Sequence, residues 1–227
     1  MKLEFTTTAC LRPELLEKTY ESLSNVIIDV DLLKEGVLYI NIDPVPNVSE
    51  SLIQKVIKVA RSYFNKVYHR IGQTGGNFSC ASSWVLSQPK GDYFFNVEDD
   101  WLFRNGTICI QDYINEIKNN PKKNILQCVV GKSKKDRSIR QNRVHFPPSL
   151  FQTKIIQSYL KKYPIPNDTN PEKWIEEIKT VKKLVDYNIT YLGGVKCSDI
   201  GYSWRKARGI EKKSEDGFEV NFTQWDL

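Results

Sequence analysis

Short runs of strand-forming residues alternate, in the first part of the chain, with segments whose apolar residues recur about every 3.6 positions. The runs predict strands at Leu3–Thr8, Val37–Ile42, Lys66–Tyr68, Tyr93–Val97 and Ile125–Val130. The intervening segments predict helices that begin at Pro13 and Ser51, and helices that span Cys80–Leu86 and Ile108–Lys118. This alternation favours an α/β fold: a single Rossmann-like domain with a mainly parallel central sheet flanked by helices.

The second part of the chain has a less regular pattern. A helix is predicted near Gln152–Lys162, and prolines break the loop that follows it. Asn170 and Pro171 predict the start of another helix, because asparagine caps helix N-termini and proline fits the first helical position. A strand is predicted at Tyr187–Leu192. The length of 227 residues suits one domain.

Composition excludes several classes of protein. Hydrophobic residues make up 40% of the chain and charged residues 26%, which argues against a disordered or fibrous protein. No run approaches the roughly 20 apolar residues of a membrane span, and the N-terminus lacks the apolar core of a signal peptide, so a cytoplasmic protein is expected. The five cysteines are scattered without CxxC spacing, which predicts free thiols.

The formal charge of +6 favours anionic partners such as nucleotides, nucleic acid or phospholipid head groups. Much of the excess lies in Lys132–Arg143, which is either a solvated loop or a phosphate-binding loop. The glycine-rich segment Ile71–Ser79 contains neither the GxGxxG pattern nor a phosphate-loop pattern. This argues against Rossmann dehydrogenases and P-loop kinases.

Three adjacent acids, Glu98, Asp99 and Asp100, directly follow the apolar run Tyr93–Val97. Adjacent carboxylates beside a core repel one another unless a cation or hydrogen-bond donors compensate them. Oxygen ligands at a strand end suit Mg2+ or Mn2+, although the same acids could form a solvated turn that caps the next helix. Asp43 also ends a predicted strand, and parallel strands place such ends at one edge, where ligands bind in α/β sheets.

These segments together resemble those of small nucleotide-sugar-dependent glycosyltransferases of the GT-A fold. The resemblance covers Leu3–Phe103: a first strand running into Thr6–Glu14, a second strand ending at Asp43, the NFSCASSW helix and the EDDW motif, which takes the place of Asp-X-Asp. A weaker likeness lies in the SDIGYSWR segment. Some enzymes of this kind glycosylate capsids of large algal DNA viruses, and a viral source would place the protein in the host cytoplasm.

The resemblance implies a role for each matching residue. The residues it places beside the nucleotide sugar are Thr7, Thr8, Arg12, Asp43, Arg70 and Asp99. The residues it places on Mn2+ or Mg2+ are Glu98, Asp99, Asp100 and, as a further ligand, His145. His145 could instead be a neutral histidine packed beside Pro147. Residues 1–103 would then form the nucleotide-sugar and metal half of the domain, and residues 104–227 the acceptor half.

An inverting transfer needs a general base near the acceptor hydroxyl, and the candidates are Glu172 and Asp199. Each also has a structural interpretation: Glu172 would favour the macrodipole at a helix start, and Asp199 would shape a turn. The expected activity is hexosyl or deoxyhexosyl transfer from a nucleotide-diphosphate sugar, UDP by preference, to a glycan or glycoprotein hydroxyl.

Two other functions remain open at this stage. A metal-dependent nucleotidyltransferase or phosphoesterase would use the same acids to position a phosphate. A nucleic-acid-binding module would explain the positive charge and the aromatic residues. The acidic strand end argues against nucleic acid, because phosphate backbones avoid carboxylates that carry no metal.

Overall fold

The computed structural model describes residues 3–28, 30–45, 48–119, 127–130, 132–133, 148–167, 169–182 and 194–208. A central six-stranded sheet has the order β3-β2-β1-β4-β8-β6. Its strands are β1 (Glu4–Cys10), β2 (Val37–Asp43), β3 (Lys66–Ile71), β4 (Tyr93–Asn96), β8 (Ser149–Gln152) and β6 (Gln127–Val129). Strands β1 to β4 are parallel, whereas β8 runs antiparallel to β4 and β6. The predicted α/β fold with a mainly parallel sheet is confirmed.

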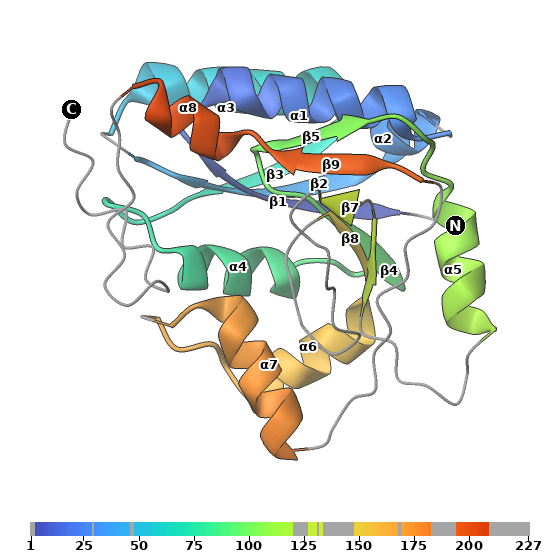
Figure 1. Ribbon diagram of the computed structural model, residues 1–227. Coiled ribbons are helices and arrows are strands. Elements are labelled where there is room, and N and C mark those ends of the chain that lie inside the picture. The colour runs from blue at the N-terminus through green and yellow to red at the C-terminus, as the bar shows by residue number, and fades with distance from the viewer. Residues whose placement is uncertain are drawn as a thin grey trace.

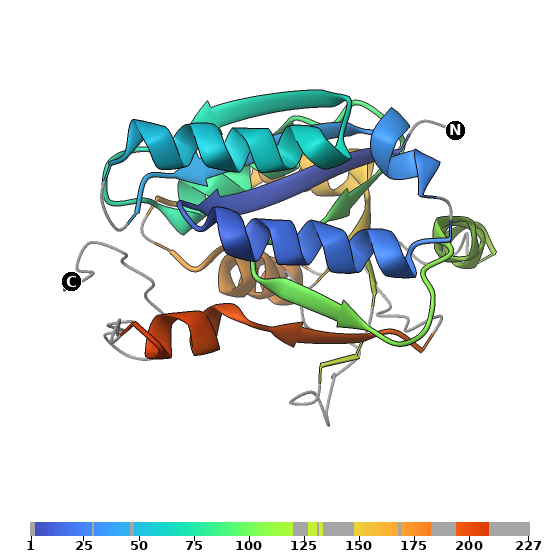
Figure 2. The same cartoon turned by 90° about the horizontal axis from the view of Figure 1, so that it is seen from above.

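Helices cover both faces of this sheet (Figure 1). One face carries α1 (Pro13–Val26) and α3 (Glu50–Tyr63), which lie side by side in both views (Figure 2). The other face carries α4 (Phe78–Ser87), on which α6 (Thr153–Lys162) and α7 (Pro171–Lys182) pack in turn. The short helix α2 (Asp31–Glu35) leads into β2, and α5 (Ile110–Lys118) follows β5.

A second, three-stranded sheet has the order β5-β9-β7 and consists of β5 (Trp101–Arg104), β9 (Lys196–Asp199) and β7 (Lys132–Ser133). Strand β9 is antiparallel to β5 in a register that pairs Asp199 with Trp101. The helix α8 (Gly201–Lys206) follows immediately. Pairing with β5 therefore brings a segment from the end of the chain beside the acids that follow β4.

Strand β4 is apolar because both of its faces are buried. Successive side chains of a strand point to opposite faces, so Phe95 joins the core under α1 and α3 while Phe94 joins the core under α4 and α6. Phe94 stacks on Phe151 of β8 with 5.3 Å between the ring centroids. Each fully buried aromatic ring removes a large apolar area from water, which fixes the register of β4 and hence the place where its acids emerge.

The sequence pattern missed four strands: β5, β7, β8 and β9. Each has only two to four residues, too few to show a period. The predicted strand at Tyr187–Leu192 and most of the basic segment Lys132–Arg143 lie outside the described residues. Within the described part of the chain, no helix combines the length and apolar character needed to cross a bilayer.

Candidate functional site

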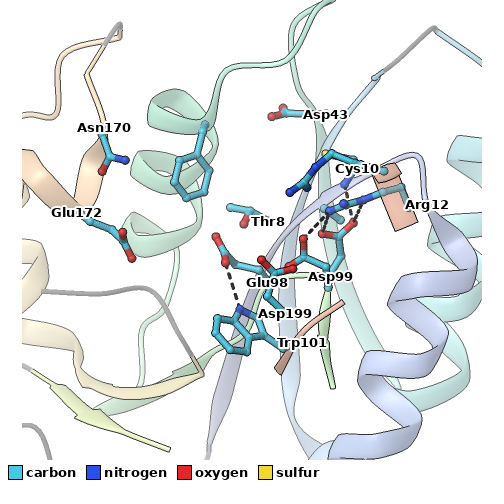
Figure 3. A pocket seen from close by; sticks show the side chains of 14 residues that line it. Thr8, Cys10, Arg12, Asp43, Glu98, Asp99, Trp101, Asn170, Glu172 and Asp199 are labelled. Carbon is cyan, nitrogen blue, oxygen red and sulfur yellow. Dashed lines mark hydrogen bonds and ion pairs between the residues drawn. The ribbon is translucent and has the colours of Figure 1, made fainter. Parts of the chain in front are cut away.

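An open pocket with a cavity volume of about 210 Å³ lies where β1, β2 and β4 end (Figure 3). We call it the acidic pocket. Its lining residues are Thr8, Ala9, Cys10, Arg12, Asp43, Phe78, Glu98, Asp99, Asp100, Trp101, Asn170, Glu172, Asp199 and Arg205. Carboxylates thus converge from four separate segments of the chain, whereas the lining contains only two arginines.

Arg12 and Asp99 form a buried, bidentate ion pair at the base of the pocket. Arg12 Nε donates to Asp99 Oδ2 at 3.1 Å, and Arg12 Nη2 donates to Oδ1 at 2.5 Å. The backbone N–H of Cys10 also donates to Oδ2, at 3.0 Å, and Thr19 Oγ1 donates to the carbonyl oxygen of Asp99 at 2.9 Å. Asp99 therefore ties the turn between β1 and α1 to the end of β4. Because Arg12 compensates its charge and three donors already contact its oxygens, Asp99 is less suited to bind a metal than Glu98 or Asp100, and its role as a ligand stays a prediction.

Glu98 and Asp100 flank this pair and are less well compensated. Trp101 Nε1 donates to Glu98 Oε2 at 3.2 Å, and Arg12 Nη2 donates to Asp100 Oδ2 at 3.2 Å. Burial raises the pKa of Glu98 well above its usual value, and the charges of Asp100 and Glu172 add to this effect. Burial likewise raises the pKa of Asp100 to about 6, although Arg12 opposes the shift. A cation in the pocket would stabilise the ionised form of both groups.

The positive groups of the pocket come from Arg12 and Arg205. Arg12 Nη1 is buried and has no hydrogen-bond partner among the described residues. Arg205, on α8, lines the pocket, and its charge opposes the rise in the pKa of Asp100. The start of α8 lies so close that a Cβ at Gly201 would be 2.1 Å from Asp100 Oδ2 and 3.0 Å from Arg12 Nη1. Glycine is therefore required there to seat α8 on the acidic strand end.

Asp43 occupies the end of β2 and is held on two sides. Asn41 Nδ2 donates to Asp43 Oδ1 at 2.8 Å, and the backbone N–H of Asn77 donates to Oδ2 at 3.3 Å. Burial raises the pKa of Asp43 to about 6. A Cβ at Gly72 would lie 2.0 Å from Asp43 Oδ1, so the glycine-rich segment contains glycine because it wraps this carboxylate.

The two candidate bases reach the pocket from α7 and β9. Glu172, in the first turn of α7, faces the pocket from the side opposite Arg12, and its charge raises the pKa of Glu98 (Figure 3). Asp199 lines the pocket too, but its Oδ1 accepts the backbone N–H groups of Gly201 at 2.8 Å and Tyr202 at 3.3 Å. Asp199 therefore shapes the predicted turn while still facing the pocket.

Two of the residues predicted for the site lie outside the pocket, and a third prediction falls outside the described part of the chain. Thr7 is fully buried and accepts a hydrogen bond from Tyr20 Oη at 2.9 Å, so its hydroxyl cannot touch a nucleotide. Arg70 lines a separate cavity together with Trp84. His145 lies outside the described residues.

Several lining residues were missed by the sequence analysis. Phe78 directly follows the glycine-rich segment, and Asn170 was recognised only as a helix cap, a role it does perform for Lys173 N at 3.1 Å. Arg205 lies in the SDIGYSWR segment, whose weak resemblance was the available signal.

The acidic pocket fits a divalent cation in charge and ligand type. Carboxylate oxygens are the ligands that Mg2+ and Mn2+ prefer, and Glu98 and Asp100 are carboxylates whose ionised forms are poorly compensated. In the chain segments that the structure describes, however, no three His, Cys, Asp or Glu side chains form a group that could hold a metal. Glu98 and Asp100 are therefore the two side chains that could hold such an ion, and its further ligands would come from a bound diphosphate and water.

No family model matches the chain, and no curated protein matches it in sequence. In structure it is similar to the mannosyltransferase PcManGT from Pyrobaculum calidifontis in complex with GDP-Man and Mn2+ (TM-score 0.57, 13% identity, 91% of this chain and 60% of that chain). It is also similar to S. aureus TarS 1-349 in complex with UDP-GlcNAc (TM-score 0.51, 14% identity, 85% and 56%). A third similar structure is 4-diphosphocytidyl-2C-methyl-D-erythritol synthase from Anaerococcus prevotii (TM-score 0.51, 12% identity, 84% and 88%).

At these identities the comparisons establish the fold alone, which is the fold that the sequence predicted. The chain spans little more than half the length of the first two structures, 60% and 56%.

Proposed function

We propose that the protein is a metal-dependent glycosyltransferase that moves a sugar from a nucleotide-diphosphate donor to an acceptor hydroxyl. The observation that carries this proposal is the convergence of Asp43, Glu98, Asp100 and Glu172 on one pocket at the carboxyl ends of parallel strands. The complexes of similar structures with GDP-Man and UDP-GlcNAc support it.

The donor would lie along the ends of β1, β2 and β4. Asp43 can accept a hydrogen bond from a base N–H, because a carboxylate is an acceptor with more lone pairs than its two partners use. Arg12 Nη1 and Arg205 supply positive charge for the diphosphate. Nη1 is buried and has no partner in the described part of the chain, which makes an anionic partner favourable. We propose UDP as the nucleotide.

Glu98 and Asp100 would hold Mn2+ or Mg2+ beside the diphosphate. When bound, such an ion stabilises the negative charge that the diphosphate gains as the sugar leaves. Asp99 would instead position this pair, since it anchors Arg12 and the turn after β1.

Glu172 is the stronger candidate for the base of an inverting reaction. It faces the pocket across from the donor side, whereas Asp199 already accepts two backbone N–H groups. A base must lie within hydrogen-bond reach of the acceptor hydroxyl, which places the acceptor, a glycan or glycoprotein, beside α7.

A nucleotidyltransferase is the second candidate, because the chain spans 88% of the similar synthase but only 56–60% of the sugar-nucleotide complexes. The two activities release different products. Incubation with UDP-, GDP-, CMP- and dTDP-sugars and Mn2+ should release the nucleoside diphosphate or monophosphate, accelerated by an acceptor. Release of pyrophosphate from a nucleoside triphosphate and a sugar phosphate, without hydrolysis of any nucleotide sugar, would instead establish the nucleotidyltransferase.

A further inference from the structure

A chain of hydrogen bonds joins β3 to the nucleotide side of the acidic pocket. Arg70 Nε donates to Asn41 Oδ1 at 2.8 Å, and Asn41 Nδ2 donates to Asp43 Oδ1 at 2.8 Å. Asn41 and Arg70 are direct partners in the parallel pairing of β2 with β3, and Asn41 and Asp43 lie two positions apart on β2. The side chains therefore share one face of the sheet.

The direction of these bonds is fixed by what each group can do. The guanidinium of Arg70 only donates, so it requires the carbonyl oxygen of the Asn41 amide. The amide NH2 must then face Asp43, and rotation by 180° would place one acceptor against another in a buried site. Asn41 is 0% exposed, which makes an unpaired or repelling amide costly.

Arg70 is itself held by α4 on the far side. Its Nη2 donates to the carbonyl oxygen of Cys80 at 3.3 Å, and its guanidinium carbon lies 5.4 Å from the centre of the Trp84 ring. A cation over a tryptophan ring is attracted by the ring electrons. The orientation of Arg70 is thus set by the packing of α4 against the sheet.

We propose that Arg70 and Asn41 are positioning residues that orient the carboxylate of Asp43 to read a ring N–H of the donor's base. This deepens the proposed function and rests on it. Arg70 acts here without touching the nucleotide, in place of the direct contact that the sequence resemblance implied. In this relay from Arg70 through Asn41 to Asp43, Asn41 holds Oδ1 of the carboxylate, the backbone N–H of Asn77 contacts Oδ2, and the remaining acceptor capacity of Asp43 serves the pocket that it lines.

The charged and titratable groups that face Asp43 come from three elements. Arg70 on β3 lowers the pKa of Asp43, Asp99 after β4 raises it, and the buried thiol of Cys10 on β1 interacts with it. Burial is the largest cause and raises the pKa. Loss of the relay therefore removes two influences, the Asn41 hydrogen bond and the Arg70 charge, that keep Asp43 ionised.

The test compares UDP with N3-methyl-UDP, which lacks the ring N–H, by calorimetry on wild type and Arg70→Met. Lys66→Met is the matched control, because it removes a cation from the same strand, at a position that is exposed. We expect Arg70→Met to weaken UDP binding about tenfold, which corresponds to the loss of one hydrogen bond. The binding of N3-methyl-UDP should be unchanged. Lys66→Met should alter neither. The relay would be refuted if Arg70→Met weakened the binding of UDP and of N3-methyl-UDP equally, or if it left the affinity for UDP unchanged.

A second measurement separates the relay from the proposed function. If wild type binds neither UDP nor GDP, the nucleotide-sugar proposal fails, and carbon NMR of the Asp43 carboxyl then reads the relay directly. The pKa of Asp43 should be higher in Arg70→Met than in wild type and unchanged in Lys66→Met, and an unchanged pKa in both variants refutes the relay. Should Arg70→Met fail to fold, Arg70→Leu, which also removes both the charge and the Nε donor, replaces it with the same expected results.

Discussion

Arg12 binds the carboxylate of Asp99 through two guanidinium nitrogens, Nε and Nη2. This ion pair joins the end of β1 to the end of β4, where the acidic motif begins. Both side chains are almost fully buried, with 5% and 3% of their surfaces exposed. The pair explains why three successive acids can follow a buried strand: the middle acid is neutralised by the chain itself.

Breaking this pair should destabilise the fold. Arg12→Met leaves the Asp99 carboxylate buried without its partner, which costs about 3–5 kcal/mol for pairs of this kind. Urea unfolding measures the loss. The control is Arg208→Met, because the Arg208–Glu14 pair is 48% and 46% exposed and such surface pairs contribute about 0–1 kcal/mol. Equal, small losses in both variants would show that the buried pair is dispensable.

The acidic pocket should bind a nucleotide diphosphate only with a divalent metal. In thermal-shift measurements, UDP at ~100 times its Kd with Mn2+ should add ~2.7 kcal/mol to the unfolding free energy, and EDTA should remove this gain. Asp100→Ala should abolish both the gain and sugar transfer while the fold stays intact, whereas Asp112→Ala, which removes an exposed acid of α5, should change neither. UDP that binds as tightly in EDTA, or a folded Asp100→Ala enzyme with normal turnover, would refute the metal assignment.

The sequence predicts a site residue correctly only where its pattern shows which face of the strand or helix that residue occupies. Thr7 and Thr8 are adjacent, yet Thr7 points to Tyr20 of α1 and Thr8 lines the pocket. The apolar run does not show which of the two is inward, since β1 is buried on both faces. The strand ends at Asp43 and Glu98 were predictable, because parallel strands place them at one edge.

Other contacts depend on tertiary packing that no local pattern encodes. Asp99 was predicted as a ligand because nothing in the EDDW motif reveals that Arg12 is bonded to it. Gly72 was interpreted as part of a loop without a nucleotide motif, whereas its missing side chain makes room for Asp43. The pairing of β5 with β9, which brings Asp199 to the site, joins segments almost a hundred residues apart.

Asp43 should make the free energy of unfolding decrease as pH rises, whereas carboxylates with a lowered pKa make it increase. Its pKa is about 6 in the fold against 3.8 as its ordinary value, so between these values the folded state binds more protons than the unfolded state. The unfolding free energy should therefore fall as pH rises from about 4 to about 6, by at most about 3 kcal/mol from this group. Asp43→Asn should flatten this dependence in urea titrations at several pH values, and Asp112→Asn should not. The same slope in wild type and Asp43→Asn would contradict the raised pKa.

Glu172 decides between two roles that predict different measurements. If it is the general base, Glu172→Gln should lower kcat by about 100-fold or more, because the amide cannot accept the acceptor's proton. Binding of UDP and its metal dependence should be unchanged, since Glu172 faces the pocket from the side opposite Arg12. A purely structural Glu172 would instead contribute about 0.3–1 kcal/mol through the dipole of α7, seen as a small fall in Tm with normal kcat.

Asp199→Asn is the matched comparison for Glu172→Gln, because it also removes one carboxylate from the pocket lining while its amide oxygen can still accept the N–H of Gly201. A large loss of kcat in Glu172→Gln with near-normal kcat in Asp199→Asn would assign the base to Glu172. The reverse pattern would assign it to Asp199. Normal turnover in both variants would leave neither as the base, and a reaction that retains the configuration of the sugar would then be the one to test, because it needs no such base.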